Sequence, residues 1–178
     1  MSELNNKSIF PQYKPDDASF SILRLWWLSL EEDKGERAYL RRCSTLTEIM
    51  LSPAFHRLLN QLGRDNVPQY RYPKLAIIAG LVSRTKGESE QKLGAEMGSP
   101  GKSSTKPDVA ELRMRRILAC DDLEELYVLL RRALSLVDNR VNISDLAAIV
   151  WNWKRMDEKS PHDPRRRIAC DYYAEVPL

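Results

Sequence analysis

The segment 121–137, DDLEELYVLLRRALSLV, constrains the fold more than any other part of the sequence. Its apolar side chains recur every three or four residues, a spacing that predicts an amphipathic helix with one buried face. Acids occupy the first turn and the pair Arg131-Arg132 lies toward the end, as the helix dipole favours. The apolar stripe consists of Leu123, Leu126, Tyr127, Leu130, Leu134 and Val137. Such a stripe has to pack against other elements of the chain.

Helical signals continue along the rest of the sequence. Residues 19–30, SFSILRLWWLSL, are apolar almost all round a helix axis, so this helix is expected to be buried on most sides. Ser52-Pro53 predicts the start of a helix that Gly63 ends. Other helix starts are expected at Asp16-Asp17, Pro73, Pro107, Ser144 and Asp163-Pro164. With no strand alternation and no internal repeat, the fold class is all-α, with about eight helices.

Residues 86–106 differ from their surroundings in composition. They contain four glycines, four serines and four lysines, but few large apolar residues. We interpret them as a flexible loop or linker, with one short turn around KLGAEM. This segment divides the chain into an N-terminal helical lobe (21–85) and a C-terminal helical lobe (107–178), preceded by an extension (1–20). The expected architecture is a two-lobed helical bundle.

The chain length and the apolar runs limit the class of protein. A chain of 178 residues suffices for one large helical domain or two small ones. No apolar run approaches the ~20 residues of a membrane span, and the first residues lack the apolar core of a signal peptide. Three widely spaced cysteines do not suggest a disulfide framework. We expect a cytoplasmic protein with no membrane partner.

Signatures of catalysis are absent from the sequence. His56 and His162 lie far apart, with no carboxylate or cysteine at metal-ligand spacing, so no metal site is indicated. The stretch GSPGKSST resembles a phosphate-binding loop, but it lacks the glycine spacing and a preceding strand. His56 is interpreted as a partly buried packing residue. We expect no enzymatic activity and no cofactor.

The charge of the chain is nearly balanced but rich in arginine. The net charge is only +3, from 28 basic and 25 acidic residues, and 18 of the basic residues are arginines. Guanidinium groups suit phosphate better than ammonium groups do, although GC-rich coding would also produce an arginine excess. The placement of the arginines therefore has to separate a solvated surface from a binding surface.

Several arginines recur at the margins of predicted buried faces. In GERAYLRRC (35–43), Tyr39, Leu40 and Cys43 are expected to face inward, with Arg37 and Arg41 on one outer ridge and Arg42 beside it. Other basic positions of this kind are Arg113 and Arg116, Arg131 and Arg132, Lys154 and Arg155, and the run Arg165 to Arg167. Each pair alone is typical of a solvated face. If the helices stack side by side, however, the pairs would form a basic track that binds phosphates without reading bases.

The tryptophans are expected to belong to the core. Trp26-Trp27, Trp151 and Trp153 each lie within an apolar stretch, which favours packing over base stacking.

The order of these motifs resembles a known family. A Trp-rich first helix is followed by GERAYLRRC, SPAFHRLL, LGAEMG, ELRMRRILACDDLEELYVLLRRALSLV and VWNWKRM. Over roughly residues 22–155 this order is similar to the CasB family, the small subunit of the type I-E CRISPR surveillance complex Cascade. The extension 1–20 has no counterpart in this resemblance, and the alignment of Arg165 to Arg167 is left open.

The resemblance implies an all-helical, two-lobed protein without enzymatic activity. Two copies would lie head to tail in Cascade, against the backbone subunits that carry the guide RNA, alongside the large subunit. Their basic surface would help to hold the target DNA opened by the guide, including the displaced strand. The positions matching basic positions of the family's nucleic-acid face are Arg42, Arg71, Arg113, Arg132, Lys154 and Arg155, with Arg41, Arg116 and Arg131 as their neighbours.

Two other functions stay open at this point. The arginines could meet acidic protein surfaces, which would make the chain a helical protein-interaction subunit without direct nucleic-acid contact. The segment DLAAIVWNWKRM could alternatively serve as the recognition helix of a helix-turn-helix regulator, although tryptophans at the reading positions argue against it.

Overall fold

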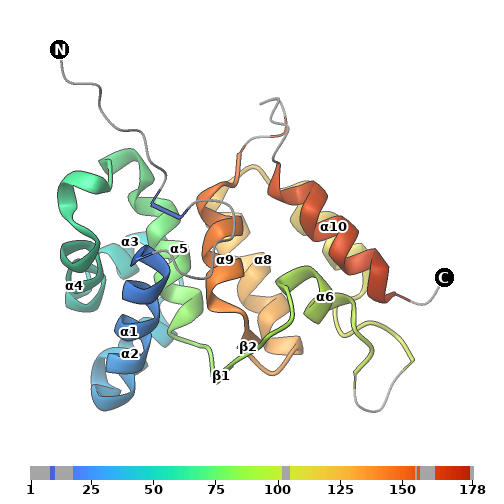
Figure 1. The fold of residues 1–178 in the computed structure, drawn as a ribbon, viewed down its shortest axis with the longest axis horizontal. Coiled ribbons are helices and arrows are strands. Elements are labelled where there is room, and N and C mark those ends of the chain that lie inside the picture. The colour runs from blue at the N-terminus through green and yellow to red at the C-terminus, as the bar shows by residue number, and fades with distance from the viewer. Residues whose placement is uncertain (1–8, 11–17, 102–104, 155, 157–162, 177–178) are drawn as a thin grey trace.

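The computed structural model of the chain describes residues 9–10, 18–101, 105–154, 156 and 163–176 (Figure 1). The predicted all-α class is confirmed, with ten α-helices in this described part of the chain and only two short strands. The elements are α1 (Ala18–Glu32), α2 (Lys34–Arg42), α3 (Leu46–Met50), α4 (Pro53–Leu62), α5 (Tyr72–Val82), β1 (Gly87–Glu88), α6 (Leu93–Gly98), α7 (Glu111–Leu118), α8 (Leu123–Leu136), β2 (Arg140–Val141), α9 (Ile143–Trp151) and α10 (Pro164–Glu175), with 3₁₀ turns at Arg64–Asn66 and Gln69–Arg71.

The predicted signals set the ends of several helices. The Ser52 side chain accepts a hydrogen bond from the Phe55 amide at 3.2 Å, and Pro53 is the first residue of α4. Gly63 ends that helix with φ of 85°, a conformation that favours glycine. The Asp122 side chain caps α8, and Asp163 caps α10. The proposed caps Asp16 and Asp17 lie outside the described residues.

The helix α9 begins earlier than the sequence suggested. The predicted cap, Ser144, is buried within the helix, and the side chain of Asn142 accepts from the Asp145 amide at 3.0 Å instead. Asn142 is as good a cap as serine, so the earlier residue satisfies the same free amide groups.

The segment 86–106 contains a helix where the sequence suggested a loop with a single short turn. Helix α6 buries Leu93 and Met97 and packs along α10 (Figure 1). Its glycines permit this close approach, because a Cβ at Gly98 would lie 2.3 Å from the Tyr172 carbonyl oxygen. Glycines that indicate a loop in the sequence thus serve helix packing. The boundaries of the two predicted lobes stay predictions.

The same segment also forms a short parallel pairing between the halves of the chain. Gly87 pairs with Arg140 and Glu88 with Val141. Hydrogen bonds from the Lys86 amide to the Asn139 carbonyl and from the Ser89 amide to the Val141 carbonyl extend this ladder. No strand was predicted here, because two residues are too few to show an alternation.

Helix α5 joins the halves through one core. It is apolar and buried from Leu75 to Val82, and it packs against α3 on one side and against α8 and α9 on the other (Figure 1). Trp26, Trp27, Trp151 and Trp153 are all buried, which confirms the prediction that they belong to the core.

Part of the N-terminal extension also reaches this core. The Phe10 side chain is fully buried, and its ring centroid lies 5.4 Å from those of Phe20 and Trp151. The Asn152 side chain donates a hydrogen bond to the Phe10 carbonyl at 3.3 Å. In the described part of the chain, no helix combines the length and the apolar content that a membrane span needs.

Candidate nucleic-acid interface

Helix α2 presents its arginines to the end of α5. Leu40 and Cys43 are buried as predicted, whereas Tyr39, also expected to face inward, is 42% exposed. Arg37 donates from Nε to the Ser83 carbonyl at 3.2 Å, and Arg41 donates from Nε to the same carbonyl at 3.2 Å. Carbonyl groups at the C-terminus of a helix are a favourable place for cations. The prediction that Arg37 and Arg41 lie on an outer ridge of α2 is therefore wrong, because both are partly buried against the end of α5.

Two further guanidinium groups meet the end of α2. Arg84, which follows α5, donates from Nη2 to the Arg41 carbonyl. Arg131 on α8 donates from Nη1 to the Cys43 carbonyl at 3.4 Å, and its guanidinium lies 5.8 Å from the centroid of the Tyr127 ring. Arginines from three separate segments therefore converge where α2, α5 and α8 meet.

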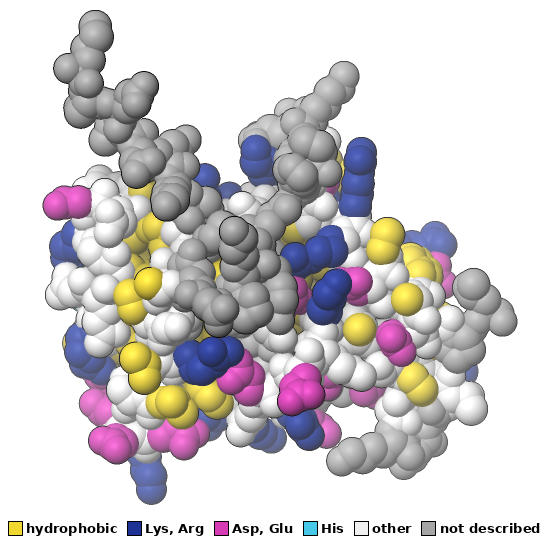
Figure 2. Space-filling view, viewed as in Figure 1, with side chains coloured by type: hydrophobic (Ala, Val, Ile, Leu, Met, Phe, Trp, Pro, Cys, Tyr) yellow, Lys and Arg dark blue, Asp and Glu magenta, His cyan; other side chains and the backbone are white. Residues whose placement is uncertain are grey.

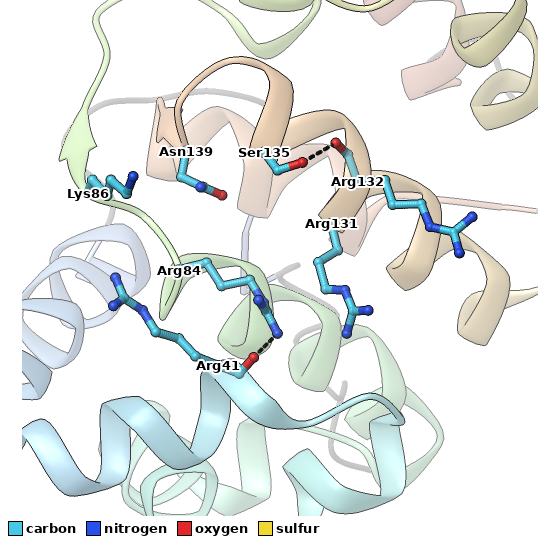
Figure 3. Close-up of a pocket in the computed structure, with 7 residues that line it drawn as sticks. All are labelled: Arg41, Arg84, Lys86, Arg131, Arg132, Ser135 and Asn139. Atoms are coloured by element: carbon cyan, nitrogen blue, oxygen red, sulfur yellow. Dashed lines mark hydrogen bonds between the residues drawn. The ribbon is translucent and has the colours of Figure 1, made fainter.

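The convergence creates a hollow of about 240 Å³, here called the basic hollow (Figure 3). The side chains of Arg41, Arg84 and Arg131 enter it from different elements, and Arg132 extends from its rim away from Arg41. Its lining residues are Arg41, Arg84, Lys86, Arg131, Arg132, Ser135 and Asn139.

A second hollow, of about 450 Å³, adjoins the first between α1 and α2 and is called the side hollow. Its lining residues are Glu31, Lys34, Arg37, Ala38 and Arg41. Arg41 lines both hollows, so the two form one continuous basic surface around α2.

The basic hollow concentrates positive charge without a neutralising carboxylate. Among the residues that the structure describes, no Asp or Glu forms an ion pair with Arg41, Arg84, Lys86, Arg131 or Arg132. Burial lowers the pKa of the Arg41 guanidinium, and the neighbouring charges of Arg37 and Arg84 lower it further. The Nε atom of Arg84 is buried without a hydrogen-bond partner in the described structure. A bound anion would relieve the repulsion between these positive charges.

Two acids on neighbouring elements, Glu48 and Glu124, pair with backbone amides. The Glu48 carboxylate accepts hydrogen bonds from the backbone amides of Ser44 at 2.6 Å and Thr45 at 3.2 Å, as part of a capping box at the start of α3. The Glu124 carboxylate accepts from the Leu46 amide at 3.1 Å. Both acids therefore satisfy the free amides of α3 rather than the arginines beside it.

The structure brings together Arg41, Arg131 and Arg132 among the predicted site residues, and it places the others elsewhere. Arg42 is exposed at the end of α2 but lines neither hollow. On α7, Arg113 is exposed, while Arg116 forms an ion pair with Glu125 at 2.9 Å.

Two other predicted residues, Arg71 and Lys154, lie around the end of α9. The guanidinium of Arg71 lies 4.9 Å from the centroid of the Trp151 ring, and its Nη1 donates to the Trp151 carbonyl at 3.1 Å. Lys154 is exposed, and its carbonyl accepts from Arg165. Arg155 lies outside the described residues.

Arg84 and Lys86 were missed by the sequence analysis. Arg84 directly follows the apolar helix α5, and Lys86 opens the segment interpreted as a linker. Cations just past the end of a buried helix are the signal that could have identified them, because they lie next to its terminal carbonyl groups.

The described residues bear on catalysis through their potential metal ligands and through the surroundings of His56. They contain no group of three or more His, Cys, Asp or Glu that could hold a metal ion. His56 is partly buried, and its ring packs edge-on against Phe55, with centroids 5.5 Å apart.

One face of the molecule is mixed in charge. On the face shown in Figure 2, Lys and Arg side chains are interspersed with Asp and Glu. A dense basic group without acids is therefore a local property of the basic hollow, rather than a general property of this surface.

Comparison with known proteins gives matches to a family model and to solved structures. The model of the family described as CRISPR-associated protein Cse2 matches residues 36–173. A chain in the crystal structure of Escherichia coli Cascade bound to a PAM-containing double-stranded DNA target has a similar fold, with a TM-score of 0.64 and 19% sequence identity. The similarity covers 89% of this chain and 98% of the Cascade chain. Comparison with curated proteins gave no match.

Proposed function

The chain belongs to the CRISPR-associated protein Cse2 family, also called CasB, and from this premise we propose that it is the non-catalytic small subunit of a type I-E Cascade complex. In this role the basic hollow binds the sugar-phosphate backbone of nucleic acid. Its partners are the guide RNA with its target DNA, the backbone and large subunits of the complex, and a second copy of the chain placed head to tail. The site of action is the cytoplasm.

The observation that carries the proposal is the group of guanidinium groups without carboxylate partners at the junction of α2, α5 and α8. Guanidinium groups pair with phosphate oxygens in a planar, two-point geometry. Several of their N–H groups donate to backbone carbonyls, which holds the side chains in place before a ligand arrives. Such contacts neutralise phosphates and do not read bases.

A sequence-independent contact suits the energetics of opening DNA. Exchanging a DNA duplex for a duplex with the guide is close to balanced in free energy, so backbone contacts can decide whether the open state persists. Each phosphate contact adds modestly and weakens as salt rises. The basic hollow therefore stabilises opened DNA without competing with the guide for sequence recognition.

The regulator alternative conflicts with the packing of α9. Every residue of α9, Ile143–Trp151, is buried, and so is Trp153. A recognition helix has to expose side chains to the major groove, and α9 exposes none. The experiment described next distinguishes the proposal from the protein-interaction alternative.

The test is a triple charge reversal in the basic hollow: Arg41→Glu, Arg131→Glu and Arg132→Glu. We expect the variant to assemble into the complex but to lose retention of opened target DNA, measured by a mobility shift of the assembled complex. The matched control reverses three arginines outside both hollows, Arg64, Arg115 and Arg166, and should retain the DNA.

A second variant distinguishes the loss of positive charge from the loss of the folded structure. Replacing the same three hollow arginines by glutamine removes the charges but keeps amide donors for the backbone carbonyls, and circular dichroism reports whether the helices persist. If the glutamate variant assembles and retains DNA as the wild type does, the proposed function is wrong. If assembly itself fails while the glutamine variant remains folded, the arginines meet acidic protein surfaces instead.

A further inference from the structure

The side hollow differs from the basic hollow in one respect. Glu31 lines it, and Glu31 is the only acid among the described residues that line either hollow. Its carboxylate Oε1 lies 3.1 Å from Nη1 of Arg37, so the two side chains form an ion pair across the side hollow. The side hollow, which has the larger volume, is therefore also the hollow in which a carboxylate partly neutralises the positive charge.

The guanidinium of Arg37 has little capacity left for another ligand. Nε donates to the Ser83 carbonyl at 3.2 Å and Nη2 donates to the Thr85 carbonyl at 2.8 Å. Nη1 faces Glu31, and the side chain as a whole is only 17% exposed. The Glu31 carboxylate thus occupies Nη1 of Arg37, which would otherwise be able to donate to a phosphate oxygen.

The two hollows therefore present different surfaces to a polyanion. A strand following the cations from Arg132 past Arg41 would meet a carboxylate on reaching Arg37. Phosphate and carboxylate compete for the same guanidinium, and the carboxylate is tethered to the neighbouring helix α1, which gives it a high local concentration. A second phosphate contact at Arg37 is then lost.

We propose that Glu31 prevents phosphate from binding in the side hollow, so that the bound nucleic-acid strand contacts Arg41 but not Arg37. The inference rests on the proposed function, because it describes where the bound strand stops. Neutralising Glu31 should extend the contact by one phosphate, since Arg37 is already held by two backbone carbonyls.

The test measures binding of the full chain to an oligothymidylate at several salt concentrations. For Glu31→Gln we expect the slope of log affinity against log salt to steepen by about 0.7, which corresponds to affinity about fivefold higher near 0.1 M salt. Glu32→Gln is the matched control: it removes the same charge from the next residue of α1, which is exposed and lines neither hollow.

A second substitution identifies the cation responsible. Arg37→Gln in the Glu31→Gln background should return the slope to its wild-type value, whereas Arg37→Gln alone should leave the slope unchanged. Equal slopes for Glu31→Gln and Glu32→Gln, with normal binding by the wild type, would overturn the inference and leave the proposed function standing. If neither the wild type nor any variant binds the probe at low salt, both are wrong.

Discussion

The basic hollow and the corner formed by α9 and α10 use the same residue type in opposite ways. In the corner, Arg165 is 5% exposed and its guanidinium lies 4.5 Å from the centroid of the Trp153 ring. It donates to the Leu118 carbonyl and to the Cys120 carbonyl, each at 2.8 Å, and pairs with Asp121 at 2.7 Å. Arg167 beside it pairs with the buried Asp145 at 2.5 Å. Both arginines are thus paired with carboxylates of the protein itself, although Nε of Arg167 is buried without a hydrogen-bond partner in the described structure.

The arginines of the basic hollow have no such carboxylate partners. Its guanidinium groups donate to single carbonyls, but in the described part of the chain none pairs with a carboxylate. The difference indicates that the number of arginines without a carboxylate partner depends on where the acids lie rather than on how many arginines are present. A run such as RRR at 165–167 is more basic in sequence than RR at 131–132, yet two of its arginines are committed to internal ion pairs.

The largest expected effect comes from the corner. Arg165→Ala should lower the free energy of unfolding by about 3 kcal/mol or more, because buried carbonyls lose a charged donor and Trp153 loses its stacking partner. Denaturant unfolding measures this. The folded fraction should bind oligothymidylate with the same dependence of affinity on salt as the wild type. A reduced salt dependence would show that Arg165 also contributes to binding and would contradict the contrast between the two regions.

The next effect comes from the basic hollow, where a substitution should change nucleic-acid binding rather than stability. Arg132→Ala should weaken binding of oligothymidylate about fivefold near 0.1 M salt and reduce the salt slope by about 0.7. Its effect on the free energy of unfolding should stay within about 0.5 kcal/mol, since alanine favours helix and Arg132 is exposed on α8. Arg115→Ala on α7, whose arginine pairs with Glu111, is the control and should leave binding unchanged.

The smallest effect concerns an acid near the hollow. Hydrogen bonds from the Ser44 and Thr45 amides hold the pKa of the Glu48 carboxyl below its ordinary value. The stabilisation from the ionised carboxylate is therefore present above the unfolded pKa and is lost as pH falls through the folded pKa. We expect Glu48→Gln to unfold more easily than the wild type at neutral pH, with the difference disappearing in acid. Thermal unfolding followed across this pH range would detect it, and a difference independent of pH would contradict it.

Local signals in the sequence predicted most of the helices. Ser52-Pro53, Gly63 and the stripe from Leu126 to Leu134 act through neighbouring residues, so no tertiary information is needed to interpret them. The helix α6 was predicted only as one short turn, because its glycines indicate a loop unless the partner α10 is known. The strand pair was missed because its two partners lie far apart in the sequence.

The candidate site was predictable only in part. Arg41, Arg131 and Arg132 lie at the margins of amphipathic helices, a position that the sequence reveals. Which arginine meets a carboxylate is decided by tertiary packing, so the pairing of Arg116 with Glu125 and of Arg37 with Glu31 could not be inferred from spacing along a helix. Arg84 and Lys86 become part of the site only because α5 ends beside α2 and α8.

The central claim is that the basic hollow binds the phosphate backbone. The most direct measurement is a cryo-electron microscopy structure of the assembled complex with opened target DNA. The account predicts phosphate groups of nucleic acid within hydrogen-bond distance of Arg41, Arg131 and Arg132, with no strand continuing past Arg41 to Arg37 in the side hollow. Aspartate or glutamate side chains of a neighbouring subunit in the basic hollow, with the nucleic acid on another face, would contradict it.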